Sequence, residues 1–377
     1  MITQDNISKI TCAADANVVD ALNNALSDLH IPEVYVQRAK QVTLVDKPGF
    51  FGIHARTLEE ENRAMFYRFY VPKQFEGSIM RRIAEAADLY LPGRGSVYAK
   101  DVTLLRNSPL EFDEKHLTEL KSNIEPIAEQ HVVLICIVQR GIASSIASTI
   151  LEMGLCVPLI SFASGTGIRD RLGLLRITIS VDKEVMYLLA PRADAELLEG
   201  VIVHKARIDQ PGQGFLYRTN IRALAVNLRV RRGKRTDAAT MDQVIAAMDQ
   251  MQGSSEWRRI GRNRAKESMK DPAAQLNCLS VITDEGALGP YSQAAMRGGA
   301  GGTTLIPLEL HFYAGKSEDH SASHAREICD HVIPSSKQAS ILKEIEAAKF
   351  FERENSMIEL SMVDKIVTYT GGKSTVV

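Results

Sequence analysis

Two loops of the same composition could each bind an anion. One is Pro-Gly-Arg-Gly at residues 92–95, and the other is Pro-Gly-Gln-Gly at residues 211–214. Glycines lack the side chains that keep a backbone away from a ligand, so paired glycines let N–H groups converge on negative charge. The chemistry that they suggest is recognition of a phosphate-like anion. Turns that only join a helix to a strand have the same composition, so this simpler interpretation stays open.

Four histidines in the last third could bind a metal. They are His311, His320, His324 and His331. His320 and His324 are four residues apart, which would place both on one face of a helix. No complete ligand spacing of a known zinc pattern accompanies them, and the run at residues 316–319 is polar. We favour a polar loop beside a strand, and a metal site at His320 and His324 is the weaker alternative.

Other chemistry is poorly represented in the sequence. No pattern resembles a catalytic triad, a Walker loop or a paired-carboxylate site, so we expect a protein that is not an enzyme and requires no cofactor. The formal net charge of -1 argues against a global nucleic-acid or membrane-binding surface. The five cysteines form no CxxC pair, and neither a signal peptide nor a membrane-spanning apolar stretch is evident. We therefore expect a cytoplasmic protein without membrane insertion.

The elements that must position the glycine loops are clearest in the middle third. The continuous apolar run at residues 131–138 predicts a strand that is buried on both faces. A helical pattern opens at Gly141 and ends at Gly154. The later elements are the strands Cys156–Ala163 and Val185–Ala190, the helix Ala193–Ala206 and the strand Phe215–Leu224. The order βαββαβ is that of a ferredoxin-like domain.

The first third repeats this order, and the last third is a weaker copy. In the first copy a loop is expected over residues 45–62, between the second and third strands. Its remaining elements are the strands 7–13, 33–44 and 64–71, the helices 18–29 and 74–89, and a last strand through Leu105. In the third copy they are the strands 276–282, 303–312, 326–333 and 356–370 and the helices 288–296 and 335–351. Residues 352–356 of the third copy contain no glycine, so this copy has lost the loop.

Two linkers separate the copies. Residues 106–130 are polar, with a helix expected over residues 113–129. Residues 228–273 are basic at both ends and contain an amphipathic helix pattern. Few aromatic residues interleave with the basic ones, so we favour a solvated connector over a nucleic-acid-binding segment.

With its elements in this order, the chain resembles the P-II-like proteins of the nitrogen regulatory protein P-II superfamily. The match is best over residues 131–224, and residues 7–105 match in element order and in the Pro-Gly-Arg-Gly loop. The segments that carry it are Val133–Gly141, Ser164–Gly167, Leu172–Leu174, Asp182–Val185 and Gln210–Gly214. The last segment is similar to the phosphate-holding B-loop of that family, and Ser164–Gly167 is similar to the base of its mobile loop.

The resemblance implies an α+β fold of three ferredoxin-like βαββαβ domains that form an intramolecular pseudotrimer. The domains would be residues 1–105, 131–227 and 274–377, the last one degenerate. Members of the family are usually homotrimers, so one chain with three copies would be a monomeric pseudotrimer. Tethering makes assembly intramolecular and lets the three clefts diverge.

The resemblance also implies a set of ligand-binding residues. They come from the two glycine loops and from the base of the second mobile loop, and they are Gly93, Arg94, Gly95, Gly165, Thr166, Gly167, Arg169, Gly212, Gln213 and Gly214. Arg218, just past the second loop, could neutralise a phosphate. The lysine that follows the glycines in the family is absent from both loops, so AMP, ADP or another small anion is expected as readily as ATP.

The implied function is that of a non-catalytic signalling protein. A small anionic effector, such as an adenine nucleotide, would bind in clefts between domains and regulate a partner protein such as a transporter or metabolic enzyme. At most two of the three clefts would use the glycine loop. One alternative is a metal-responsive protein of the CutA type that uses the histidine group, and another is a scaffold whose clefts are vestigial.

Overall fold

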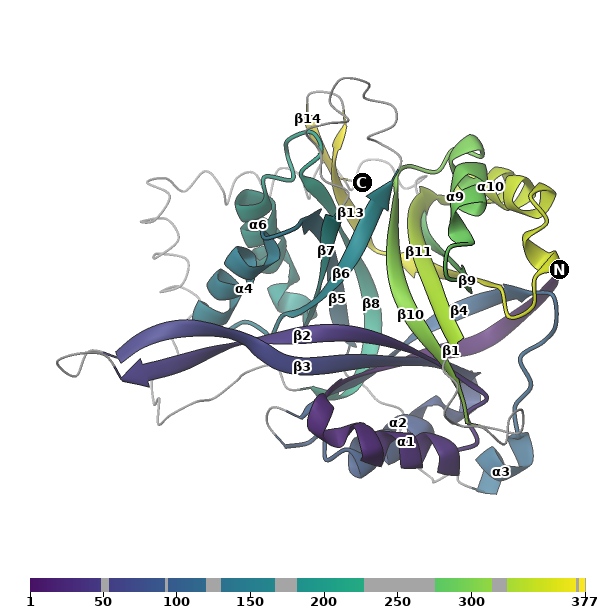
Figure 1. The fold of residues 1–377 in the computed structure, drawn as a ribbon, viewed down its shortest axis with the longest axis horizontal. Coiled ribbons are helices and arrows are strands. Elements are labelled where there is room, and N and C mark those ends of the chain that lie inside the picture. The colour runs from purple at the N-terminus through teal and green to yellow at the C-terminus, as the bar shows by residue number, and fades with distance from the viewer. Residues whose placement is uncertain are drawn as a thin grey trace.

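The described residues of the computed structural model form a mixed α+β fold. They are residues 1–48, 54–91, 94–119, 130–166, 182–226, 275–313, 324–370 and 373–376. The strands pair antiparallel in one large sheet system, and pairs of helices lie on its outer side (Figure 1). Among the described helices, none has both the length and the apolar character needed to cross a membrane.

The same order of elements occurs three times, in segments that we call unit 1, unit 2 and unit 3. Unit 1 comprises β1 (Ile2–Asp15), α1 (Val19–Asp28), β2 (Glu33–Pro48), β3 (His54–Pro72), α2 (Glu76–Ala86) and β4 (Gly95–Arg106). Unit 2 comprises β5 (Gln130–Gln139), α4 (Ala143–Glu152), β6 (Leu159–Thr166), β7 (Asp182–Pro191), α6 (Ala195–Ala206) and β8 (Gly214–Val226). Unit 3 comprises β9 (Leu276–Asp284), α9 (Leu288–Arg297), β10 (Thr303–Phe312), β11 (His324–Pro334), α10 (Ser335–Ala347) and β12 (Met357–Val363).

Strand order is also shared by the three units. The strands lie in the orders β4-β1-β3-β2, β8-β5-β7-β6 and β12-β9-β11-β10, so the fourth, first, third and second strands are neighbours in each unit. The other described elements are α3 (Glu114–Glu119), β13 (Lys365–Thr370), β14 (Lys373–Val376) and the short 3-10 helices Ala16–Val18, Lys73–Phe75, Arg192–Asp194 and Phe350–Glu352. The βαββαβ order predicted from the sequence is thus confirmed in all three segments.

The strand β5 shows why these sequences form a two-sided sheet. Val132, Leu134, Cys136 and Val138 lie in an outer core with α4 and α6. The alternate residues Val133, Ile135 and Ile137 lie in a different, central core. Successive side chains of a strand point to opposite faces, so a continuous apolar run is needed where both faces are covered. The prediction of a strand that is buried on both faces is confirmed.

The last strands of the three units pair with one another in a closed ring. The first half of each last strand pairs with one neighbouring unit, and the second half pairs with the other neighbouring unit. The second half of β8 pairs with the first half of β4, the second half of β4 pairs with β12, and β13, which follows β12, pairs with the first half of β8. Identical use of the two halves in every unit is the relation expected of a threefold arrangement.

The second strands form another closed ring on the opposite edges of the units. The start of β2 pairs with the end of β10, the start of β10 pairs with the end of β6, and the start of β6 pairs with the middle of β2. Both edges of every unit are therefore occupied by another unit, which removes the unpaired strand edges that an isolated unit would expose.

Closure of the two rings creates a central core between the three sheets. This core draws buried residues from every unit, among them Tyr70 of unit 1, Ile135 of unit 2 and Ile328 of unit 3. Each unit also has an outer core of its own, which lies between its sheet and its helices. Val42 of unit 1 and Val367 of β13 enter the outer core of unit 2, so neighbouring units interlock.

The described parts of residues 45–62 differ from the predicted loop. Residues 45–48 continue β2 and residues 54–62 belong to β3, and the two strands pair residue by residue from Val45↔Thr57 to Pro48↔His54. The resulting hairpin runs past the rest of the sheet at the left of Figure 1. Antiparallel backbones pair whatever the polarity of their side chains, so a charged run such as residues 59–61 does not exclude a strand.

The end of unit 3 also differs from its prediction. The single strand expected over residues 356–370 is divided at Asp364 into β12 and β13, because the chain leaves β9 and β4 there and joins β8. The predicted helix over residues 335–351 ends at Ala347. In the glycine-free turn before β12, Asn355 has a φ of 54° and takes the left-handed conformation that glycine supplies elsewhere.

Of the two predicted linkers, only part is described. Within residues 106–130, the described helix is α3, which covers Glu114–Glu119. The basic segment 228–273 and its predicted amphipathic helix lie outside the described residues.

Candidate functional site

A pocket opens between unit 1 and unit 2 beside the first glycine loop. The first residues of β4, the end of β1 and the base of the β2–β3 hairpin form one wall, and strands of unit 2 form the other. Its lining residues are Ala13, Ala14, Gln41, Ala64, Phe66, Gly95, Ser96, Tyr98, Val133, Val157, Leu159, Tyr187 and Leu189. The space open to the centres of water-sized molecules is ≈ 40 Å³. This volume accommodates one small group, such as a carboxylate or phosphate, rather than a whole nucleotide.

The geometry of Gly95 explains why a glycine stands at this position. Its φ is 142°, and a Cβ there would lie 2.1 Å from the carbonyl oxygen of Ala13. Gly214 has a φ of 141°, and its Cβ would lie 2.0 Å from the carbonyl oxygen of Ile137. The two loops are therefore structurally equivalent, and the last glycine of each is required by the close approach of a neighbouring strand. A role as turn residues is therefore enough to explain why both positions are glycine. Of the features near these two loops, the pocket next to Gly95 is the one that points to a ligand.

The rest of the first loop is only partly described. Gly93 lies outside the described residues. The carbonyl oxygen of Arg94 accepts a hydrogen bond from the backbone N–H of Asp15 at 3.0 Å. Within the described part of the chain, no carboxylate pairs with Arg94.

The second glycine loop lies at the same end of its sheet as the predicted base of the mobile loop. Gly214 pairs with Val138, Val138 pairs with Glu184, and Asp182 pairs with Ser164 at the end of β6. The carbonyl oxygen of Gly212 accepts a hydrogen bond from Gln139 Nε2 at 3.1 Å.

Five further predicted residues belong to this part of the sequence. Gln213 lies in the turn that precedes β8. Gly165 and Thr166 pair with Thr304 and Thr303 of β10, so this part of β6 joins unit 2 to unit 3. Gly167 and Arg169 lie outside the described residues.

Arg218 is not brought to the glycine loop. It lies four residues further along β8, or about 13 Å at 3.3 Å per residue. Its guanidinium pairs with Glu199 at 2.7 Å and with Asp364 at 2.6 Å, and all three side chains are largely buried. Arg218 thus joins α6 to the break between β12 and β13 at Asp364, and a phosphate would have to compete with two carboxylates.

The histidines that could bind a metal lie in three different environments. His324 begins β11, is exposed and contacts the ring of Phe312, so it lies on a strand instead of the helix that the spacing would allow. His311 on β10 lies 3.7 Å from Glu309. His331 is buried, seven residues along β11 from His324 or about 23 Å. His320 lies outside the described residues, and within the described ranges no group of three His, Cys, Asp or Glu side chains is placed to hold a metal.

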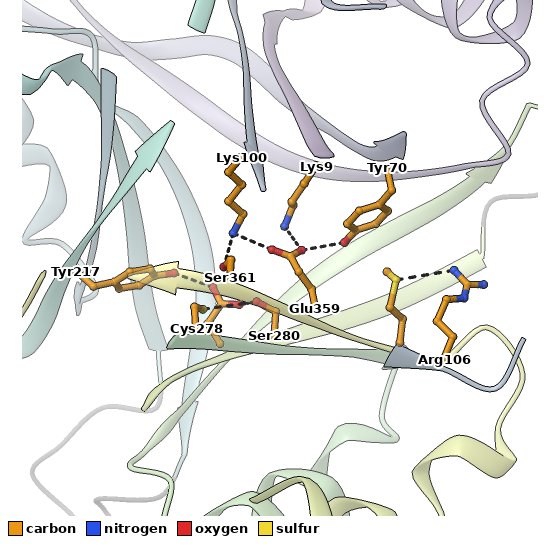
Figure 2. Close-up of polar contacts among 11 residues, drawn as sticks. Lys9, Tyr70, Lys100, Arg106, Tyr217, Cys278, Ser280, Glu359 and Ser361 are labelled. Carbon is orange, nitrogen blue, oxygen red and sulfur yellow. Dashed lines mark hydrogen bonds and ion pairs between the residues drawn. The ribbon is translucent and has the colours of Figure 1, made fainter. Parts of the chain in front are cut away.

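A buried polar cluster at the centre of the molecule is absent from the sequence-based predictions. Glu359 of unit 3 is fully buried and accepts hydrogen bonds from Lys9 Nζ at 2.6 Å and from the Tyr70 hydroxyl at 2.9 Å. Lys100 Nζ lies 2.7 Å from the other oxygen of Glu359 and donates a hydrogen bond to Ser361. Figure 2 shows Lys9, Tyr70 and Lys100 of unit 1 converging on this single carboxylate.

The electrostatics of this cluster favour an ionised carboxylate. Burial by itself would raise the pKa of Glu359, but Lys100 and Lys9 together outweigh it, so that pKa lies well below its ordinary value. A second carboxylate, Asp330 of unit 3, accepts hydrogen bonds from the hydroxyls of Tyr217 at 2.9 Å and Ser280 at 2.6 Å. Glu359 is thus held by cations, whereas Asp330 is held by neutral donors.

A second cavity adjoins this cluster where the three sheets meet. Unit 1 contributes Lys9, Thr11, Gln37, Arg68, Tyr98 and Lys100 to its lining. Unit 2 contributes Val133, Ile135, Tyr187, Tyr217, Thr219 and Ile221, and unit 3 contributes Cys278, Ser280, Ile306, Ile328, Asp330, Ser361 and Val363. The cations of this cavity thus come from unit 1 and its carboxylate from unit 3.

A signal for this cluster exists in the sequence but is ambiguous. The charged residues of the cluster lie on the strand faces that alternate away from the helices, and they are Lys9, Lys100 and Glu359. On an isolated sheet, that face would be exposed to water and charged residues would be expected there. Only the closure of the two rings turns this face inward.

Comparisons with known proteins add no family assignment. A scan against protein-family models found no match, and a search of curated proteins also found none. What can be argued about function therefore comes from the residues and their arrangement.

Proposed function

We propose that this chain is a non-catalytic regulatory protein of the P-II-like kind, in which three ferredoxin-like domains form an intramolecular pseudotrimer. The shared βαββαβ order and the shared strand order of the three units support the domain assignment. The two closed rings of strand pairing support the pseudotrimer, because every unit uses the same edges in the same way.

The effector in this proposal is a small anion that binds between unit 1 and unit 2. The observation that carries it is the pocket beside Gly95 and Ser96 at the base of the β2–β3 hairpin. Its walls are mainly apolar, with Gln41 and Ser96 as polar groups, which is the usual character of a small-molecule site. One anionic group enters the pocket near Arg94, and the rest of a larger effector, such as an adenine nucleotide, lies outside it.

Effector binding in the pocket would act on the β2–β3 hairpin, because the hairpin forms part of the pocket wall. The hairpin is the element that we assign to partner binding. Gln41 on β2 and Ala64 on β3 both line the pocket, and the hairpin extends beyond them. An effector that contacts both strands would bias the position of the hairpin, and the hairpin would then contact a transporter or a metabolic enzyme. A ligand can shift such an equilibrium only by its difference in affinity for the two hairpin positions.

Isothermal titration calorimetry of the full chain tests the effector site. The ligands are AMP, ADP, ATP, cyclic AMP, 2-oxoglutarate and bicarbonate, and we expect at least one of them to bind. Val157→Trp, which fills the pocket from unit 2, and Arg94→Gln, which removes the cation next to Gly95 in the first glycine loop, should each weaken that binding by about tenfold or more. Arg82→Gln, at an exposed position of α2, is the matched control and should leave the affinity unchanged.

Two outcomes would contradict this proposal. The first is the absence of heat and of any thermal shift with all six ligands, which would instead favour a scaffold whose clefts are vestigial. The second is binding that Val157→Trp and Arg94→Gln leave intact, which would place the effector elsewhere on the molecule.

A further inference from the structure

The central cavity shares Tyr98, Val133 and Tyr187 with the pocket beside Gly95, but it has features of a ligand site of its own. It is lined by residues of all three units and lies against the Lys9–Glu359–Lys100 cluster shown in Figure 2. The space open to the centres of water-sized molecules is ≈ 60 Å³. At 10–15 Å³ for each water, this corresponds to roughly four to six water molecules or to one anion of a few atoms.

Two buried donors on the wall of this cavity lack acceptors. Arg68 on β3 is 8 % exposed, and its Nη1 has no hydrogen-bond partner. Gln37 on β2 is 1 % exposed, and its Nε2 is likewise without a partner. Buried donors of this kind are rare in folded proteins, because each loses its hydrogen bonds to water without replacement. Both residues line the cavity, so an acceptor inside it would satisfy them.

The plane of the Arg68 guanidinium is held in place by aromatic rings. Its central carbon lies 4.8 Å from the ring centroid of Phe66 and 5.5 Å from that of Tyr187. These contacts come from unit 1 and unit 2, so the orientation of the guanidinium depends on the closed arrangement. A guanidinium that is already oriented binds a planar oxyanion with less loss of conformational entropy.

The charges around the cavity are unbalanced by one. Lys9, Arg68 and Lys100 supply three positive charges, whereas Asp330 and Glu359 supply two negative charges. Glu359 is shared by the two lysines, and Asp330 is held by the hydroxyls of Tyr217 and Ser280. Arg68 is therefore the cation without a carboxylate of its own in this part of the structure. Water could satisfy its hydrogen bonds but not its charge.

We propose that the central cavity binds a small monovalent oxyanion of the carboxylate or bicarbonate type, held by Arg68 and Gln37. Arg68 Nη1 and Gln37 Nε2 donate hydrogen bonds to the oxygens of the anion, and the anion completes the charge balance of the core. The cavity is too small for a nucleotide, so this ligand differs from the proposed effector. Arg68 and Gln37 belong to unit 1, whereas the aromatic support Tyr187 belongs to unit 2 and the rest of the lining comes from all three units. The anion therefore stabilises the closed arrangement of the three units.

Calorimetry and thermal unfolding of the full chain with sodium formate, acetate and bicarbonate test this site. We expect binding of one anion per chain and a rise in Tm beyond that produced by sodium sulfate at equal ionic strength. Arg68→Gln and Gln37→Leu should each weaken binding by about tenfold or more. Gln37→Leu keeps every charge and much of the side-chain volume, so it covers the case in which Arg68→Gln does not fold. The matched control is Arg297→Gln, because Arg297 is exposed and far from the cavity in an ion pair with Glu344.

The proposal is overturned if neither calorimetry nor thermal unfolding detects binding by the wild-type chain. Binding that survives both Arg68→Gln and Gln37→Leu would overturn it equally, as would a crystal structure in formate that shows only water in the cavity. The effector experiment with the nucleotides is independent, because Val157→Trp and Arg94→Gln alter the other pocket. Bicarbonate is in both ligand sets, so its binding counts for the effector site only if Val157→Trp or Arg94→Gln weakens it, and for the central cavity only if Arg68→Gln or Gln37→Leu weakens it. Formate binding without nucleotide binding would support the central site and not the effector site. Nucleotide binding without formate binding would support the effector site and not the central site.

Discussion

At the scale of single residues, the interior of this protein contains groups whose protonation is set by burial. His331 on β11 is 1 % exposed, and burial lowers its pKa to about 4, with only a partial opposing effect from Asp330. Its Nδ1 has no partner, and its Nε2 lies 3.5 Å from the sulfur of Cys329. The imidazole is therefore held in its neutral form inside the fold.

This environment predicts that acid destabilises the protein through His331. Its pKa is lower in the folded chain than its ordinary value of 6.5, so the unfolded chain binds more protons between pH 6.5 and about 4. The free energy of unfolding should fall as the pH drops through this window, by up to about 3 kcal/mol. Guanidinium unfolding at several pH values should show this fall in the wild type and a smaller one in His331→Leu.

The same series contains its own control. His204→Leu, at an exposed position of α6, should retain the pH profile of the wild type. Parallel profiles for the wild type and His331→Leu would contradict the assignment to His331.

At the scale of elements, the two glycine loops are equivalent turns between a helix and the last strand of a unit. In both, the final glycine passes so close to a carbonyl oxygen of the first strand that a Cβ has no space. The third unit reaches its last strand through a different turn, in which Asn355 has a positive φ. The difference between unit 3 and the other two is therefore local to this turn, because the order of its elements and strands is unchanged.

Alanine substitution should separate these glycines from others in the chain. Gly95→Ala and Gly214→Ala place a Cβ about 2 Å from a backbone oxygen at a positive φ, so each should lower the free energy of unfolding by several kcal/mol. Gly77→Ala in α2 is the matched control, because a Cβ there meets nothing within 4 Å. It should leave stability unchanged or raise it by up to about 1 kcal/mol.

Denaturant unfolding of the three variants measures this contrast. If Gly95→Ala were as stable as Gly77→Ala, the close approach of Gly95 to β1 would not hold in solution. If Gly95→Ala retained its stability but lost effector binding, Gly95 would be required for ligand binding and not for the conformation of the turn.

At the scale of the whole molecule, charged residues hold the units together at their centre. Glu359 of unit 3 is bound by Lys9 and Lys100 of unit 1, and all three are largely buried. A buried ion pair is weak evidence of net stabilisation, but removal of one partner leaves uncompensated charge in the core. The cluster should therefore specify how unit 3 docks on unit 1 more than it adds to overall stability.

This view predicts a large effect for one neutralising substitution and a smaller one for a full replacement. Glu359→Gln leaves two buried lysines without a carboxylate and should lower the free energy of unfolding by about 3–5 kcal/mol. The triple variant Lys9→Met, Lys100→Met, Glu359→Leu should recover most of that loss. Glu344→Gln, whose ion pair with Arg297 is exposed, is the control and should change stability by less than about 1 kcal/mol.

The pH dependence of this cluster has a defined sign. Because the pKa of Glu359 is lower in the folded chain than its ordinary value of 4.5, the stabilisation by the cluster is present above pH 4.5 and declines as the pH falls below it. Urea unfolding between pH 3 and pH 7 should show a steeper decline below pH 4.5 in the wild type than in the triple variant, which keeps the decline caused by His331. A triple variant as unstable as Glu359→Gln would show that the cluster itself, and not the unpaired charge, decides stability.

The sequence by itself determined the elements and their order. Apolar periodicity, glycine positions and the continuous apolar run of β5 are local properties, and they predicted the βαββαβ order of all three units. It misjudged residues 45–62 and the break at Asp364, because pairing of backbones in a hairpin and a change of strand partner leave little trace in side-chain pattern.

Only the tertiary structure decided what the inner faces of the three sheets contact. The strand positions of the central charged residues, Lys9, Arg68, Lys100 and Glu359, are compatible with an exposed sheet face. No local signal in the sequence distinguishes an exposed sheet face from a buried one. Pairing of strand edges that are distant in sequence closes the two rings, and this closure buries those charges together. Burial is a property of the assembled units, so both the pocket beside Gly95 and the cationic cavity at the centre exist only once the units have met.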